Sequence, residues 1–527
     1  MKIKTMAVAA LCCAMQLTPS VAQDKHNLVP DTPSAAPDYF CTWNLQGYVV
    51  SYTGGDPTRE AMNEEYMFGK GKYQDWVNVS YPTIRKDLYF VMDDSWDIPQ
   101  DVNTPSNPYL GTVELDATRF PSFKGNATER LKQLTDRVKK AGWKGAGGWV
   151  CAQKPGNKAD IDENTYWTEK LKEHHAAGFS YWKVDWGRHE RDGQWRKTLT
   201  ELGKKYAPGL WIEHAFQNEF TAFSDVFRTY DVENITAQPV TIQRVCNILP
   251  QCATGGAKGI INCEDEPYIA AGLGCAIGVM RHPFNGNLPD GNQDITFPPV
   301  GRNVKQRIDE VIRGVRWHRI AEPFGVDGKS YAIDGNRLED YWTLDKDETW
   351  NKSRPVGSVV KESAPARVSR CMPLVEVSDS TSTDRPFILA SRYPNGATAV
   401  ASIGRALDRE YYTKEIGVTF AVAQPEAPIG IFGRFASVTI TLPEGSRAKD
   451  YEIYAQDLAA DKADNISKKV TAKGNSITLP GELINRVGLA AATEGDLSDP
   501  GLVVRLFKKG KYGKVRPVFN TSQKDAF

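Results

Sequence analysis

Acidic residues occur at the ends of several short apolar runs in the first half of the chain. Asp93 and Asp94 follow the run 88–92, and Asp185 follows the run 181–184. Further acids stand at the ends of later runs, namely Glu213, Asp231, Glu264 and Asp265. Two carboxyl groups on either side of one bond are the minimum equipment for hydrolysis of a glycosidic linkage. The pattern therefore predicts chemistry that is carried by carboxyl groups.

Two other residue types near these acids bear on the same chemistry. Lys183 and Asp185 are two residues apart in one run, so a strand places both side chains on the same face. The ammonium group of Lys183 would then favour the ionised form of Asp185. Trp149, near the end of the run 145–150, adds an indole that suits a sugar ring, although packing is the commoner use of tryptophan.

Each acid also has a purely structural interpretation. A single aspartate at a strand end is more often a turn former or a helix cap than a catalyst. Asp93 and Asp94 could also cap a helix or bind calcium weakly. Acids end most of the expected strands, however, and this coincidence favours one shared site.

Between residues 40 and 334, short apolar runs alternate with amphipathic stretches, which predicts alternating strands and helices. The candidate helices include 127–141, 166–177 and a closing 304–320, and the candidate strands are 45–50, 88–92, 145–150, 181–184, 210–212, 226–230, 259–262 and 276–280. This alternation suits a (β/α)₈ TIM barrel, which needs about 250 residues and places its active site at the carboxyl ends of the strands. A doubly wound sheet is the alternative, but no glycine-rich phosphate turn follows the first expected strand.

The chain changes character at both ends of this region. Beyond 335, alternating runs separated by Asn-Gly, Pro-Glu-Gly and Gly-Asn turns predict a C-terminal antiparallel β-sandwich over 335–527. Its candidate strands are 386–391, 397–403, 437–442, 451–454, 476–479 and 502–507. A polar, proline-rich stretch predicts a flexible leader over 24–39, ahead of the barrel at 40–334.

The composition argues against several classes of protein. The 527 residues include 65 basic and 65 acidic ones. The chain therefore lacks the excess of positive charge that is typical of nucleic-acid-binding proteins. An apolar share of 41% and a charged share of 25% exclude a wholly disordered chain. The histidines show no HxH or HExxH spacing, which argues against a metal-dependent hydrolase. Hydrolysis by two carboxyl groups needs neither a metal nor an organic cofactor, so we expect none.

The first 23 residues predict a secretory signal peptide. Lys2 and Lys4 form its basic end, residues 6–15 its apolar run, and Ser20-Val21-Ala22 its cleavage region. No later run is long enough for a transmembrane helix. We therefore expect a secreted or periplasmic protein without a membrane span.

Four short motifs occur in a fixed order along the barrel region. They are Tyr89-Phe90-Val91-Met92-Asp93-Asp94-Ser95-Trp96, Arg119-Phe120-Pro121, Ala141-Gly142-Trp143-Lys144-Gly145 and Tyr181-Trp182-Lys183-Val184-Asp185. In order and approximate spacing over residues 85–285, they resemble the melibiase-type α-galactosidase clan of glycoside hydrolases, families 27 and 36. The expected sandwich is similar to the C-terminal domain of that clan.

The resemblance implies a role for each candidate residue. Asp185 would be the nucleophile of a retaining mechanism and Asp231 the general acid/base, with carboxyl groups about 5–5.5 Å apart. The other candidates would bind the substrate: Asp93 and Asp94 at sugar hydroxyls, Lys183 beside the nucleophile, Glu213 at the 2-hydroxyl, and Trp149, Arg228 and Asp265 around them. The substrate would be a terminal α-galactosyl residue of an oligosaccharide or of a polysaccharide side chain.

Departures from the clan pattern leave the sugar open. Ser95 stands where the clan has cysteine, and Trp186-Gly187 follows the nucleophile motif. Alternatives are a β-L-arabinopyranosidase, an isomaltose-releasing hydrolase, or a sugar-binding barrel without catalysis. Glu213 could also form only a structural ion pair with Arg228, and the oligomeric state stays open.

Overall fold

The computed structural model describes residues 27–51, 54–102, 108–230, 235–252, 259–284, 307–325, 330–345 and 355–511. The expected signal peptide at 1–23 and the expected acid/base Asp231 lie outside these residues. Within them, no helix has the length and apolar character needed to cross a bilayer.

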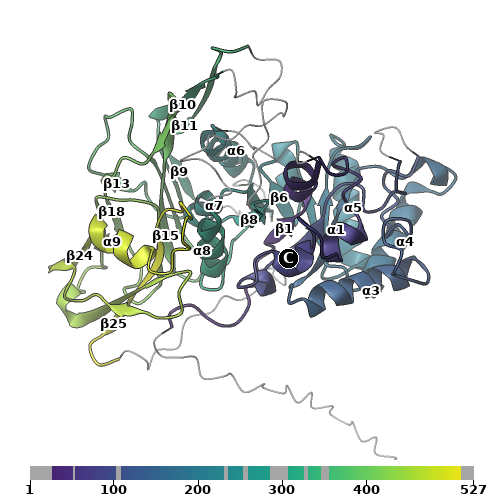
Figure 1. The fold of residues 1–527 in the computed structure, drawn as a ribbon. Coiled ribbons are helices and arrows are strands. Elements are labelled where there is room, and N and C mark those ends of the chain that lie inside the picture. The colour runs from purple at the N-terminus through teal and green to yellow at the C-terminus, as the bar shows by residue number, and fades with distance from the viewer. Residues whose placement is uncertain are drawn as a thin grey trace, which may run out of the picture.

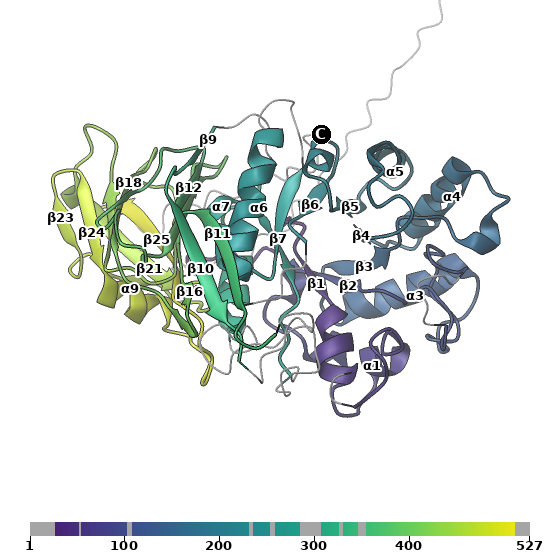
Figure 2. The same ribbon diagram turned by 90° about the horizontal axis from the view of Figure 1, so that it is seen from above.

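Eight parallel strands close into a barrel in the order of the sequence, as the alternating pattern predicts (Figures 1 and 2). The strand β8 pairs with β1 and closes the ring. The strands are β1 (Tyr39–Cys41), β2 (Tyr89–Met92), β3 (Gly145–Val150), β4 (Tyr181–Val184), β5 (Trp211–His214), β6 (Val226–Arg228), β7 (Ile260–Glu264) and β8 (Ala276–Val279).

Helices and short helical turns connect these strands. The α-helices are α1 (Glu64–Phe68), α2 (Trp76–Val79), α3 (Ala127–Lys140), α4 (Glu163–Ala176), α5 (Gly193–Tyr206), α6 (Ala237–Cys252), α7 (Pro267–Leu273) and α8 (Ile308–His318). The shorter ones are η1 (Leu45–Val50), η3 (Arg85–Asp87), η4 (Gly156–Lys158) and η5 (Asn218–Ala222). Helices α3, α4 and α5 cover the outside of the first half of the barrel (Figure 2).

The helix α3 illustrates why the sequence folds this way locally. Asn126 and Glu129 form a reciprocal capping box, which satisfies backbone donors at the helix start. Leu131, Leu134 and Val138 recur at helical spacing and are buried on the barrel side. Both signals were readable in the sequence, and the observed bounds agree with the expected helix.

The expected first strand at 45–50 is wrong. Residues Leu45–Val50 form a π-helix, and the first strand is Tyr39–Cys41, which pairs with both β2 and β8. All six residues of the π-helix are buried. A short apolar run reflects burial, and its periodicity alone does not separate a strand from a helical segment.

The expected flexible leader also needs correction over its described part. Leu28 and Val29 are buried, and the backbone amide of Leu28 donates to Gln456 Oε1 at 2.6 Å. Asp38 is fully buried, and its carboxylate lies 2.6 Å from His318 Nδ1. Residues 27–38 therefore pack against the rest of the protein. The proline-rich composition indicated a segment without regular secondary structure, and not a flexible one.

Beyond the barrel, three sheets form the C-terminal part, and their pairing is mixed rather than only antiparallel. Most neighbours are antiparallel, but β12–β14, β15–β19, β18–β20 and β10–β16 pair in parallel. The eight-stranded sheet runs β22-β21-β25-β19-β15-β14-β12-β9, the five-stranded sheet β13-β18-β20-β24-β23, and the four-stranded sheet β11-β10-β16-β17. One apolar cluster is shared by the first two sheets, which makes them a sandwich.

The elements of this part lie where the alternating pattern predicts strands, with extra strands between them. They are β9 (Tyr331–Ile333), β10 (Arg337–Thr343), β11 (Val359–Pro365), β12 (Arg367–Arg370), β13 (Glu376–Val377), β14 (Phe387–Arg392), β15 (Thr398–Ile403), β16 (Arg405–Leu407), β17 (Glu410–Tyr412), β18 (Gly417–Ala421), β19 (Ile429–Phe432), β20 (Ser437–Thr441), η7 (Ala448–Asp450), β21 (Tyr451–Asp457), β22 (Asp464–Asn465), β23 (Thr471–Lys473), β24 (Ser476–Pro480), α9 (Gly481–Gly488) and β25 (Gly501–Lys508). The domain boundary at 334/335 stays a prediction, and β9 already pairs with β12 in the large sheet.

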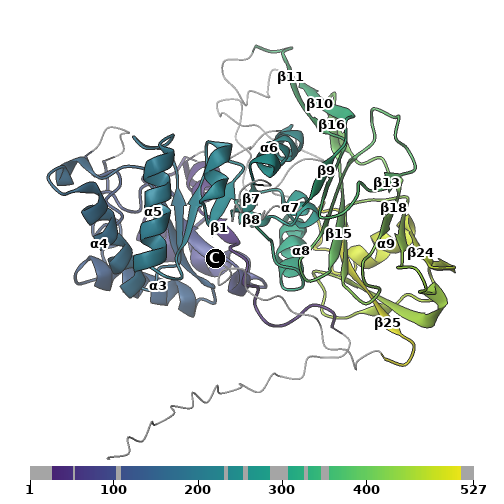
Figure 3. The same cartoon turned by 180° about the vertical axis from the view of Figure 1, so that it is seen from behind.

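The sandwich and the barrel meet through α7 and α8 (Figure 3). Apolar residues of the large sheet join the barrel's own core cluster, among them Leu389, Ala401 and Phe432. The guanidinium of Arg313 on α8 holds both oxygens of Asp457 on β21, at 2.9 Å and 3.1 Å. Both side chains are fully buried, so this contact is a desolvated bidentate pair.

Candidate active site

Side chains that point into the barrel form two groups. One is an aromatic and aliphatic cluster made of Tyr39, Cys41, Tyr89, Val91, Tyr181, Trp211, Val226, Ile260, Ala276 and Met280. The other is ionisable and lies toward the carboxyl ends of the strands, and it contains Asp93, Lys183, Asp185, Glu213, Arg228 and Glu264, all buried. Strand alternation brings them to one place, because every second residue of a strand faces the same side.

Asp185 lies directly after β4, and its carboxylate is held on two sides. The indole Nε1 of Trp149 on β3 donates to Asp185 Oδ2 at 2.9 Å. The guanidinium of Arg228 on β6 lies 2.7 Å from Asp185 Oδ1. A hydrogen bond from β3 and an ion pair with β6 therefore fix the position of the carboxylate.

Asp93 lies at the end of β2 and pairs with Lys183 across the barrel. Lys183 Nζ donates to Asp93 Oδ2 at 3.0 Å, and the Cys41 thiol donates to the same oxygen at 2.8 Å. Burial alone would raise the pKa of Asp93, but the Lys183 charge and these hydrogen bonds hold that pKa below its ordinary value. Asp93 is therefore a carboxylate at neutral pH, and Lys183 is directed at it rather than at Asp185.

Asp94 points to a different partner from that of its neighbour. Its Oδ2 accepts from Arg59 Nε at 2.9 Å, and its Oδ1 accepts from Ser95 Oγ at 3.0 Å. Burial raises the pKa of Asp94 to about 6, although the Arg59 charge opposes this shift. Arg59 lies between η1 and α1 in a segment without any recognisable motif, so sequence reasoning missed it.

Arg228 is the electrostatic centre of the site. Besides Asp185, it lies 3.2 Å from Glu213 Oε1 and 3.7 Å from Glu264 Oε1. Burial would lower the pKa of Arg228, but the three carboxylates raise it well above its ordinary value. The guanidinium stays charged, and it links acids that come from β4, β5 and β7.

Glu213 is fully buried, and four groups donate to its carboxylate. Its Oε1 accepts from Arg228 Nη1 at 3.2 Å and from Tyr39 OH at 3.4 Å. Its Oε2 accepts from Tyr181 OH at 2.8 Å and from Asn262 Nδ2 at 3.1 Å. Burial raises its pKa. The pairing with Arg228 considered from the sequence is present, while contact with a sugar 2-hydroxyl stays a prediction.

Glu264 ends β7 and Asp265 follows it, and the two acids differ in direction. The sequence analysis selected Asp265 as the substrate-binding residue. Glu264 points into the barrel, where its Oε1 accepts from Tyr39 OH at 3.1 Å and lies 3.6 Å from Lys183 Nζ. Asp265 instead contacts the end of β8, with Oδ1 accepting from the backbone amides of Met280 and Arg281 at 3.1 Å each. The signal that could have separated them is strand parity, because Glu264 is in phase with Asn262.

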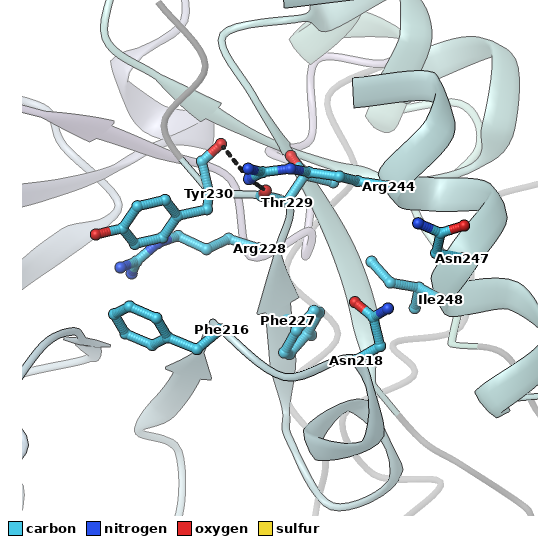
Figure 4. Close-up of a pocket in the computed structure, with 9 residues that line it drawn as sticks. All are labelled: Phe216, Asn218, Phe227, Arg228, Thr229, Tyr230, Arg244, Asn247 and Ile248. Atoms are coloured by element: carbon cyan, nitrogen blue, oxygen red, sulfur yellow. Dashed lines mark hydrogen bonds between the residues drawn. The ribbon is translucent and has the colours of Figure 1, made fainter. Parts of the chain in front are cut away.

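A cavity of about 300 Å³ lies beside this site, between the ends of β5 and β6 and the helix α6. It is lined by Phe216, Asn218, Phe227, Arg228, Thr229, Tyr230, Arg244, Asn247 and Ile248. Figure 4 shows the Arg228 side chain directed away from Arg244 and toward the rings of Phe216 and Tyr230. Asp231 follows Tyr230 directly in the sequence, but it is not among the described residues.

Asp97 lies in the carboxylate-rich loop after β2. We expect its protonation to make the stability of the fold depend on pH. Its Oδ2 accepts from the Val113 amide at 2.8 Å, but its buried Oδ1 has no hydrogen-bond partner among the described residues, and burial raises the pKa of Asp97 to about 7. Because this folded pKa exceeds the unfolded one of about 3.9, the folded state binds more protons than the unfolded state between about pH 4 and pH 7, and stability falls over this range by up to about 4 kcal/mol. We expect Asp97→Asn to raise the melting temperature at pH 8 and to raise it much less at pH 5.

The exposed Asp136 on α3 provides the matched control, because its side chain is 60% exposed. Asp136→Asn should change stability by less than about 0.5 kcal/mol at either pH. Thermal unfolding followed by circular dichroism measures all three proteins. An equal gain for Asp97→Asn at pH 5 and pH 8 would contradict the assigned titration.

No group of three or more histidine, cysteine or acidic side chains in the described ranges has the arrangement of a metal site. The described chemistry consists of carboxylates, one lysine and one arginine at the rim of the barrel. The structure is therefore that of a (β/α)₈ barrel with a carboxylate-lined site and a β-sandwich behind it.

Comparisons with known proteins agree on low similarity. No protein-family model and no curated protein matches the chain. Among solved structures, α-galactosidase I from Mortierella vinacea has 13% identity over 90% of this chain and 98% of that one, with a TM-score of 0.38. A β-L-arabinopyranosidase from Geobacillus stearothermophilus has 10% identity over 90% and 97%, with a TM-score of 0.41. At such values, the likeness carries no conclusion about activity.

Proposed function

We propose that the protein is an exported retaining exo-glycosidase that hydrolyses terminal α-galactosyl residues through two carboxylates. One observation carries the proposal. The buried carboxylate of Asp185 lies at the active rim of a barrel, with Trp149 Nε1 2.9 Å from one oxygen and Arg228 Nη2 2.7 Å from the other. A carboxylate fixed in this way suits nucleophilic attack on an anomeric carbon.

The surrounding charges support a polyhydroxylated substrate. Asp93 and Asp94 are neighbouring acceptors, and they form ion pairs with Lys183 and Arg59, respectively. Carboxylates fixed in this way can accept hydrogen bonds from adjacent sugar hydroxyls. The enzyme needs neither a metal nor an organic cofactor in this mechanism, because carboxyl groups supply both the nucleophile and the proton. Export is proposed from the basic and apolar pattern of residues 1–23 alone.

Asp231 is proposed as the general acid/base from the sequence. We expect Asp231→Ala to lose roughly 10²–10⁴-fold in kcat/KM on substrates with poor leaving groups, the usual contribution of general acid catalysis. Activated aryl glycosides should lose much less, because their leaving groups need little protonation. Steady-state kinetics on both substrate types measure the difference. Equal losses on both types would argue against Asp231 as the acid.

Two measurements test the proposed reaction as a whole. A panel of 4-nitrophenyl glycosides in both anomeric forms, with β-L-arabinopyranoside and α-N-acetylgalactosaminide included, identifies the sugar. Proton NMR of the first-formed sugar then gives the stereochemistry, and we expect the anomeric configuration of the substrate to be retained. An inverted product would exclude Asp185 as a nucleophile. Binding of galactose without turnover of any glycoside would indicate the non-catalytic alternative.

A further inference from the structure

Arg196 is a buried cation outside the barrel interior that the proposed reaction does not use. It lies on α5, and its side chain is fully buried. No carboxylate in the described part of the chain forms an ion pair with it. Among the other fully buried arginines, Arg119, Arg228 and Arg313 each have such a pair, whereas Arg370 likewise has none there and donates to backbone carbonyls. A buried guanidinium without a carboxylate is costly, so its remaining partners must compensate.

Those partners are backbone carbonyls of a single segment. Arg196 Nη2 donates to the carbonyl oxygen of Asp185 at 2.6 Å, and Nη1 donates to that of Val184 at 3.3 Å. Its Nε donates to the carbonyl oxygens of Glu190 at 3.0 Å and His189 at 3.3 Å. One side chain therefore connects the end of β4 with the loop that follows the proposed nucleophile.

His214 completes the arrangement and fixes its protonation. Because an arginine cannot accept a hydrogen bond, the contact of 3.1 Å between Arg196 Nη1 and His214 Nδ1 requires an unprotonated Nδ1. The remaining proton lies on Nε2, which donates to Thr200 Oγ1 at 2.8 Å. Burial and the Arg196 charge lower the pKa of His214 well below its ordinary value, in agreement with a neutral ring.

The rest of the loop has little freedom to compensate for a loss of Arg196. Gly187 has a φ of +146°, and a Cβ there would lie 2.8 Å from the backbone of Ala152. The backbone amides of Ala152 and His189 bond to the carbonyl oxygens of Trp186 and Ala152, at 2.8 Å and 2.9 Å. The loop therefore packs against the segment after β3 on one side and is hydrogen-bonded to Arg196 on the other.

We propose that Arg196 is a positioning residue, which sets the backbone of Asp185 and of the loop 185–190 so that the nucleophilic carboxylate faces the substrate. This inference rests on the proposed glycosidase function. In the described structure Arg196 forms no hydrogen bond or ion pair with the Asp185 carboxylate, so it acts on that group through the backbone carbonyls. The planar fork of a guanidinium can serve several carbonyls at once, which a methionine or a lysine cannot do.

Two readouts of Arg196→Met test the proposal, with Lys197→Met as the control. Lys197 is the next residue on α5, and its side chain is 52% exposed. On the glycoside that the wild-type protein cleaves best, we expect Arg196→Met to lose roughly 10²-fold in kcat with KM changed less than threefold, since displacement of a reacting group costs about that much. Amide hydrogen exchange in peptides covering 185–191 should accelerate, while exchange in the other barrel strands stays at the wild-type rate.

The conservative Arg196→Lys variant keeps the test decisive if the methionine variant does not fold. A compact ammonium reaches fewer of the four carbonyls, so we expect an intermediate loss of kcat and an intermediate gain in loop exchange. Wild-type kcat and wild-type exchange in either folded variant would overturn the proposal. A wild-type protein that cleaves no glycoside would refute the proposed function instead, and the exchange readout would still decide whether Arg196 holds the loop.

Discussion

Replacement of Asp185 by alanine is expected to remove nearly all turnover of the glycoside that the wild-type protein cleaves. The variant lacks the carboxylate that Trp149 and Arg228 hold in place, and no other described acid lies directly after β4. Without a nucleophile, the glycosyl-enzyme intermediate cannot form. Steady-state kinetics with an aryl glycoside measure the loss.

Azide distinguishes a missing nucleophile from a damaged fold. In Asp185→Ala a small anion can enter the space that the carboxylate left and attack the anomeric carbon directly. An α-linked substrate should then give a β-glycosyl azide with partial recovery of the rate. Asp160→Ala is the control, because Asp160 is exposed and lies on the same rim beyond β3. Full activity of Asp185→Ala would refute its role.

The second large effect concerns stability at the contact between the barrel and the sandwich. Asp457→Ala leaves the Arg313 guanidinium buried without its bidentate partner, which accepts at 2.9 Å and 3.1 Å. Removal of one member of a buried ion pair costs about 3–5 kcal/mol, because the other charge stays desolvated. We expect a loss of this size in the free energy of unfolding, measured by urea denaturation.

Asp461→Ala is the matched control for this experiment. Asp461 pairs with Arg316, one turn along α8, at 2.5 Å, but its side chain is 79% exposed. Exposed pairs contribute roughly 0–1 kcal/mol. Comparable losses in the two variants would contradict the importance of burial at Arg313. A combined Arg313→Met and Asp457→Leu exchange should recover part of the stability, since it removes both charges.

The strands that carry the site were predictable from the sequence, because their signals come from residues that are neighbours along the chain. The runs 145–150 and 181–184 are fully buried strands with the expected bounds, because continuous apolar runs of that length suit the inside of a parallel barrel. The position of Asp93, Lys183 and Asp185 at the rim follows from strand ends and alternation. These relations need only neighbours along the chain.

What the sequence did not reveal depends on distant partners. Arg59 reaches Asp94 from a loop without a motif, and Arg196 reaches the loop after β4 from a helix of ordinary composition. The π-helix at Leu45–Val50 has the apolar character of a strand, so its misassignment concealed Tyr39 and Cys41 as residues of the first strand. Contacts made across the fold leave no trace in local periodicity.

The packed N-terminal segment has a consequence for the order in which the molecule folds. Leu28 donates to Gln456 Oε1, and Gln456 Nε2 donates back to Asn27 Oδ1 at 2.8 Å, so residues near the start bond to a strand more than 400 positions later. Synthesis runs from the N-terminus, and contacts of such sequence separation form late. Asn27 and Leu28 therefore lack these partners until most of the chain has emerged, so this contact between the first described residues and one of the last strands forms late in folding.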